Sequence, residues 1–78
     1  MENRLKELRL AKGYTQIQIQ MKIGIDQADY SKMETGARNL SYENCRLLAV
    51  LFGTSMDYLA GLTDVKEPYP KADNIIEI

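Results

Sequence analysis

The sequence predicts an all-α domain of five short helices, followed by a short extended C-terminal tail. Two observations support this fold class. Apolar residues recur at helical spacing, and most of these segments lie between a polar residue suited to an N-cap and a glycine. The chain of 78 residues suffices for one small hydrophobic core, and its composition, 45% hydrophobic and 27% charged, is ordinary for a globular domain.

The first helix is predicted over residues 3–12. Leu5, Leu8 and Ala11 follow one another at intervals of three, and charged residues occupy most of the positions between them. Gly13 then ends the helix, because glycine adopts the left-handed backbone of a helix C-terminus without steric cost.

The second segment, "YTQIQIQMKIGI", alternates apolar and polar residues, which taken alone is typical of a half-buried strand. Two features favour a helix that starts at Gln16. Thr15 is a good N-cap, and Gln18 three residues later completes a capping box. Ile19 and Ile23 then lie on one face, whereas a strand would lack a pairing partner in the flanking segments.

The three remaining helices follow the same pattern. Asp26 is the candidate N-cap of the third helix, in which Tyr30 and Met33 share a face. Ser41 precedes the fourth helix, over residues 42–52, and Ser55 caps the short fifth helix, "MDYLA". The fourth helix is largely apolar, and its core candidates are Cys45, Leu48, Ala49 and Phe52.

We therefore expect one domain over residues 1–64 and an extended or flexible tail over residues 65–78. The segment "TDVKEPYPKAD" is polar and contains two prolines, as linkers do. The terminal "NIIEI" is apolar again, so it could form a short strand or attach to a partner, and it is a candidate for dimerisation.

Composition also excludes several classes. The chain has no histidine and a single cysteine, Cys45, so zinc sites, disulfides and histidine-based catalysis are not expected, and neither an enzyme nor a cofactor or small-molecule ligand is indicated. No apolar run approaches a membrane span or a signal peptide, which favours the cytoplasm. Net charge is −1, but residues 1–40 carry seven basic and five acidic side chains, so the N-terminal half is better suited to face phosphate.

The second and third helices are joined by the tight turn "IGID", which is the arrangement of a helix-turn-helix. Such a unit places its second helix in the DNA major groove, where residues at the N-terminus of that helix reach base edges. In this chain those residues are Gln27, Ala28 and Asp29, followed by Ser31 and Lys32.

The chain resembles the Xre/Cro family of phage-repressor-like DNA-binding domains. The resemblance covers residues 5–64 and rests on several motifs at matching spacing: "LR", "G-Y-T-Q", "IG", "E-x-G", "R-N" and "S-x-D-Y-L-x-G". Each motif is weak alone, but together they are specific. The resemblance implies a five-helix lambda-repressor-like fold.

The resemblance also assigns roles to single residues. Gln16 matches a residue that contacts a DNA phosphate and supports the reading glutamine, and Gln27 matches that reading glutamine, which can pair with adenine through N6 and N7. Ala28 could touch a thymine methyl group. Ser31 and Lys32 could contact bases or phosphate.

Three further residues match positions outside the helix-turn-helix itself. Arg38 and Asn39 match loop positions that meet the DNA backbone, and Tyr42 is a candidate phosphate contact at the start of the fourth helix. The resemblance also implies that Arg9 and Glu34 form a structural ion pair between the first and third helices.

Three residues depart from the family pattern. Gln20 and Tyr30 occupy positions usually held by small and β-branched residues, and we expect the tyrosine hydroxyl to meet the glutamine amide, because buried polar groups need partners. Asp29 places a carboxylate toward a negative groove, which costs affinity unless it accepts a hydrogen bond from cytosine N4.

The sequence thus predicts a sequence-specific regulator of transcription, a repressor that binds double-stranded DNA as a homodimer through the fifth helix and the tail. The alternative is a protein-interaction module of the same fold, such as an antitoxin or the target of an anti-repressor. Asp29 and the low basicity favour the alternative, whereas Gln16, Gln27, Lys32 and Arg38 favour DNA binding.

Overall fold

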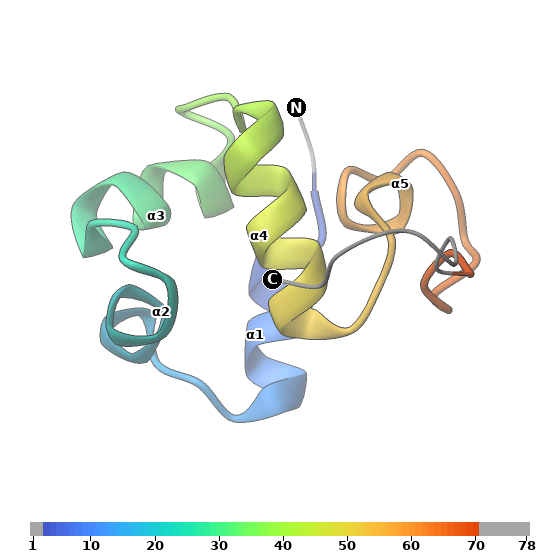
Figure 1. Ribbon diagram of the computed structural model, residues 1–78. Coiled ribbons are helices and arrows are strands. Elements are labelled where there is room, and N and C mark those ends of the chain that lie inside the picture. Colours follow the sequence, from blue (N-terminus) through green and yellow to red (C-terminus); the bar gives the residue numbers. More distant parts are fainter. Residues whose placement is uncertain (1–2, 71–78) are drawn as a thin grey trace.

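In a computed structural model of the chain, which describes residues 3–70, five helices enclose one core. Within this part of the chain there is no strand. The helices are α1 (Leu5–Lys12), α2 (Gln16–Ile23), α3 (Gln27–Thr35), α4 (Tyr42–Phe52) and α5 (Met56–Leu59). Figure 1 shows α4 at the centre of the domain, with the α2–α3 pair on one side and α5 on the other.

The predicted caps form, and they explain why the alternating segment is helical. The Thr15 hydroxyl accepts a hydrogen bond from the Gln18 backbone N–H at 3.1 Å, and the Gln18 side chain accepts one from the Thr15 N–H at 2.7 Å. This capping box satisfies donors that the first turn of α2 would otherwise leave unpaired. Asp26, Ser41 and Ser55 likewise cap α3, α4 and α5 through their side chains.

Two helix boundaries differ slightly from the prediction. α1 begins at Leu5, because the Asn3 side chain accepts a hydrogen bond from the Leu5 N–H at 3.0 Å and holds the preceding residues outside the helix. α5 ends at Leu59, one residue earlier than expected, and Ala60 is its C-cap.

The core lies between the five helices, and the predicted buried face of α4 is fully confirmed. Its buried apolar residues are Leu5, Leu8, Ile19, Ile25, Tyr30, Met33, Cys45, Leu48, Ala49, Phe52 and Leu59. Two predicted inward positions are more open: Ile23 is half-buried, and Ala11 is exposed in the last turn of α1. Among residues 3–70, no helix is long and apolar enough to cross a membrane.

The predicted contact between Gln20 and Tyr30 is wrong. Gln20 is exposed, and its side-chain oxygen accepts a hydrogen bond from the Gln27 backbone N–H at 2.8 Å. That N–H lies in the first turn of α3, where backbone donors have no partner within the helix. Tyr30 is instead fully buried, and its hydroxyl has no partner that meets hydrogen-bond geometry. Burial and the nearby Glu34 carboxylate both raise the pKa of Tyr30.

The chain beyond α5 is attached to the domain by polar contacts. Arg4 donates hydrogen bonds to the carbonyl oxygens of Tyr58 at 2.6 Å and Thr63 at 2.7 Å. The buried Thr54 hydroxyl donates to the Lys66 carbonyl at 2.6 Å. These bonds fix the start of the predicted tail against α5, whereas "NIIEI" lies outside the described residues.

Candidate nucleic-acid interface

The α2–turn–α3 unit has the geometry of a helix-turn-helix. α2 ends at Ile23 and α3 begins at Gln27, and Gly24 between them adopts a φ of 76°. A side chain is strained in this left-handed conformation, which explains the glycine. Ile25 in the turn is 8% exposed and packs into the core, so it holds the two helices together.

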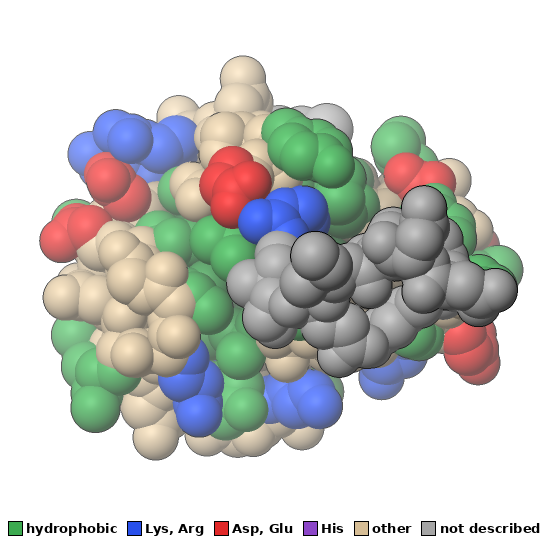
Figure 2. Space-filling view, in the orientation of Figure 1, with side chains coloured by type: hydrophobic (Ala, Val, Ile, Leu, Met, Phe, Trp, Pro, Cys, Tyr) green, Lys and Arg blue, Asp and Glu red, His purple; other side chains and the backbone are tan. Residues whose placement is uncertain are grey.

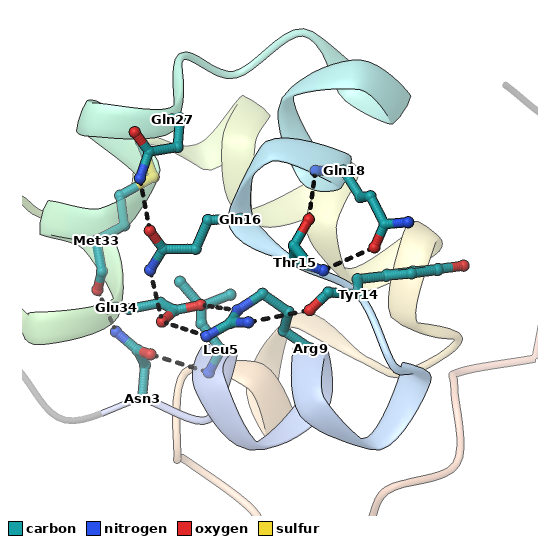
Figure 3. Close-up of polar contacts among 10 residues, drawn as sticks. All are labelled: Asn3, Leu5, Arg9, Tyr14, Thr15, Gln16, Gln18, Gln27, Met33 and Glu34. Atoms are coloured by element: carbon teal, nitrogen blue, oxygen red, sulfur yellow. Dashed lines mark hydrogen bonds and ion pairs between the residues drawn. The ribbon is translucent and has the colours of Figure 1, made fainter.

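A chain of hydrogen bonds runs from α1 to the first residue of α3, as Figure 3 shows. Arg9 pairs with the Glu34 carboxylate through Nε at 2.6 Å and Nη2 at 3.2 Å. Gln16 donates from Nε2 to Glu34 Oε1 at 3.2 Å, and its Oε1 accepts from Gln27 Nε2 at 2.8 Å. Gln16 therefore contacts Gln27 directly, as the predicted support of Gln27 requires.

The ion pair between Arg9 and Glu34, from which these hydrogen bonds start, is largely buried, as its predicted structural role requires. The side chains of Arg9 and Glu34 are 11% and 5% exposed. Burial alone would raise the pKa of Glu34, but hydrogen bonds from Arg9 and Gln16 outweigh it and lower that pKa. The hydrogen bond to Glu34 raises the pKa of Arg9. Both groups are therefore charged at neutral pH.

The charge of Glu34 fixes the orientation of both glutamine amides. An ionised carboxylate only accepts hydrogen bonds, so Gln16 must turn its NH₂ group toward Glu34 and its oxygen toward Gln27. Gln27 must then donate from Nε2 to Gln16. This leaves Gln27 one Nε2 hydrogen and its Oε1 for a ligand. One donor beside one acceptor is the pattern that complements N7 and N6 of adenine.

The other predicted site residues lie on α3 and in the loop that follows it. Ala28 and Lys32 are exposed on α3, and Ser31 is half-buried. Asn39 and Tyr42 are exposed, Tyr42 by 71%, next to the N-terminus of α4. Asp29, Arg38 and Asn39 line one hollow between α3 and α4. The structure thus brings together two groups, Gln16 with Gln27 and Asp29 with Arg38.

Two polar contacts of α3 were not predicted. Arg38 Nη2 lies 3.3 Å from Asp29 Oδ1, and Gln20 accepts a hydrogen bond from the Gln27 N–H. Neither contact has a local sequence signal, because they depend on how the α3–α4 loop and the end of α2 fold against α3.

The fold and this site are those of a helix-turn-helix domain. In such a domain the second helix of the unit, here α3, presents polar side chains to solvent. A family model described as Helix-turn-helix matches residues 5–59, so the chain belongs to this family, in its Xre-like form. The resemblance seen in the sequence is thereby confirmed, and the five-helix arrangement is consistent with the lambda-repressor-like fold.

One curated relative is an uncharacterized HTH-type transcriptional regulator, YobD, from Bacillus subtilis strain 168. It is 35% identical over 74 residues, which cover 95% of this chain and 66% of YobD. The chain therefore spans slightly less than two thirds of that relative. No solved structure matches the chain significantly.

Proposed function

We propose that this chain is a sequence-specific regulator of transcription that binds double-stranded DNA with α3 in the major groove. The observation that carries the proposal is Gln27, the first residue of α3. Gln16 holds its side chain so that one donor and one acceptor remain free. The name of its relative, a transcriptional regulator of the helix-turn-helix type, supports the same class of function.

The remaining site residues have separate roles in this proposal. Ala28 packs against a thymine methyl group, and Lys32 and Ser31 contact phosphate or base edges beside it. Arg38, Asn39 and Tyr42 meet the DNA backbone beyond the groove. Repression is the simpler direction of regulation, because a domain bound over a promoter blocks transcription without further contacts.

We also propose that the chain acts in the cytoplasm as a homodimer, since one domain of this size reads only a few base pairs. Apolar residues support a contact surface around α5 and the tail. Ala49, Val50, Met56 and Tyr69 line a largely apolar hollow, and Val50 and Tyr69 are 61% and 59% exposed.

Selection of bound sequences from a random duplex pool tests the DNA-binding proposal. At low salt the wild-type chain should enrich one motif with two-fold symmetry. Gln27→Ala should lose the preference at one base pair of each half-site, where a good amide–adenine pair discriminates by about 1–3 kcal/mol. Enrichment of no sequence would rule the proposal out, and an unchanged motif with Gln27→Ala would remove its central residue.

Variants that remove a single lysine test the proposed contacts with phosphate. Lys32→Ala should weaken binding to all sequences and make the salt dependence shallower, by about 0.9 in the slope of log K against log salt for one lost phosphate contact. Lys6→Ala, an exposed lysine on α1, is the matched control and should leave both unchanged.

A protein-interaction module of the same fold is the second candidate. It is favoured by the mixed charge over α3, where Figure 2 shows acidic and basic side chains close together rather than a continuous basic surface. A wild-type chain that enriches no duplex would favour this candidate.

A further inference from the structure

The pair formed by Asp29 and Arg38 lies beside the residue proposed to read DNA. Asp29 is in the first turn of α3, two positions after Gln27. Its backbone N–H donates to the Asp26 side chain at 3.3 Å. Its own carboxylate lies 3.3 Å from Arg38 Nη2.

A backbone hydrogen bond fixes the position of Arg38 in the loop after α3. Its N–H donates to the Lys32 carbonyl at 3.1 Å, which folds the loop back onto the end of α3. The side chains of Arg38 and Asp29 are 49% and 39% exposed. A pair this open to solvent contributes little to stability, so a competing charge can separate it.

DNA supplies such a competing charge. A phosphate attracts Arg38, whereas the negative groove repels the Asp29 carboxylate. The two residues therefore respond to DNA in opposite ways. Once Arg38 has left for a phosphate, Asp29 is stable in the groove only if it accepts a hydrogen bond from a base, and cytosine N4 is the donor that suits a carboxylate.

We propose, on the basis of the function proposed above, that Asp29 and Arg38 form one coupled specificity element. Arg38 exchanges Asp29 for a phosphate when cytosine lies opposite Asp29. On other sequences Asp29 either keeps Arg38 from the phosphate or remains unpaired in the groove, and binding is weaker in both cases. Specificity at this position then comes chiefly from a penalty against wrong sequences.

Asp29→Ala and Asp29→Asn test the penalty by selection and by affinity measured on duplexes that differ at the single selected position. The wild-type chain should prefer cytosine there by about 5–150-fold, the range of one good base contact. Asp29→Ala should bring this ratio close to one by binding the other duplexes more tightly. Asp29→Asn should also reduce it, because the amide carries no charge for the groove to repel.

Arg38→Ala tests the coupling. In the wild-type background it should weaken binding to the cytosine duplex more than to the others, whereas in the Asp29→Ala background the loss should be equal on all duplexes. Asp64→Ala is the matched control, since it removes an exposed carboxylate from another ion pair, with Arg4 at 2.9 Å, near α5. It should change none of these ratios.

The results separate the two proposals. A wild-type motif that Asp29→Ala leaves intact at every position overturns this inference and leaves the proposed function standing. An equal effect of Arg38→Ala on all duplexes in the wild-type background also overturns the coupling. A wild-type chain that enriches no sequence overturns the proposed function and this inference with it.

Discussion

Glu34 is the residue on which the candidate site depends most, although it lies in the last turns of α3 and is 5% exposed. It accepts hydrogen bonds from Arg9 on α1 and from Gln16 on α2, so it joins three helices. Its charge also sets which atoms Gln27 presents. A buried carboxylate thus determines the donor and acceptor pattern on the surface.

Removal of Arg9 should therefore be costly. Arg9→Ala would leave the Glu34 charge buried and uncompensated, and we expect it to lower the free energy of unfolding by about 3–5 kcal/mol. Arg46→Ala is the matched control. The distance in its pair with Glu43 is also 2.6 Å, but these side chains are 28% and 60% exposed.

Because the second pair is open to solvent, its loss should cost far less than the loss of the buried pair. Urea unfolding of the two variants measures the difference directly. Equal losses would mean that burial does not distinguish the two pairs, and the structural role of Arg9 would be wrong.

Glu34 should also make stability depend on pH. Folding lowers its pKa below the ordinary value of 4.5, so the unfolded chain takes up a proton first as the pH falls. The stability contributed by this carboxylate is complete above pH 4.5 and is lost as the pH falls through the lower pKa of the folded state. Urea midpoints between pH 7 and pH 3 should fall further for the wild-type chain than for Glu34→Gln. Parallel curves would contradict this explanation.

At the level of the helices, the sequence alone predicts the caps and ends of each helix, but it does not predict which side chains meet between helices. Thr15 with Gln18, Asp26 and Gly24 act on their own helix ends, so their spacing identified α2 and α3 despite the strand-like alternation. The Arg9–Glu34 pair was expected only through the family resemblance, since no local pattern joins residues 25 positions apart.

The wrong prediction for Gln20 has the same physical origin. Its position on α2 was inferred correctly, but its partner depends on the angle at which α3 meets α2. The Gln27 N–H at the end of the turn has no partner within α3, and the exposed Gln20 side chain accepts a hydrogen bond from it. The sequence indicates Asp29 and Arg38 separately, but their pairing depends on the fold of the loop between α3 and α4.

Gln20 therefore should act as an additional cap of α3. Gln20→Ala removes the acceptor of the Gln27 N–H, and we expect a loss of about 0.5 kcal/mol, the low end for a hydrogen bond, because water can replace an exposed partner. The sharper readout is amide hydrogen exchange, which should become faster at Gln27. Gln20→Glu keeps an acceptor at this position and should preserve the protection. Unchanged exchange in Gln20→Ala would show that this bond does not hold the start of α3.

At the level of the whole molecule, the helix proposed to read DNA and the proposed dimer contact lie on opposite sides of the domain. Figure 1 places α2 and α3 on one side of α4 and α5 on the other, so a contact through α5 would leave α3 open. Val50→Glu should place a charge within the proposed dimer contact, and light scattering should then report the mass of a monomer. Leu10→Glu is the control, since Leu10 on α1 is similarly exposed, at 58% against 61% for Val50. A dimer mass for Val50→Glu would exclude this contact.

One substitution in the DNA tests the proposed pairing of Gln27 at a single atom. The hydrogen bonds that run from Arg9 to Gln27 leave Gln27 a donor for adenine N7 and an acceptor for adenine N6. In the selected duplex, 7-deazaadenine at the preferred position replaces N7 by carbon and leaves the Watson–Crick edge unchanged. Wild-type affinity should fall by about 1–3 kcal/mol, and Gln27→Ala should bind both duplexes equally. Equal wild-type affinity for the two duplexes would contradict the pairing of Gln27 with adenine N7.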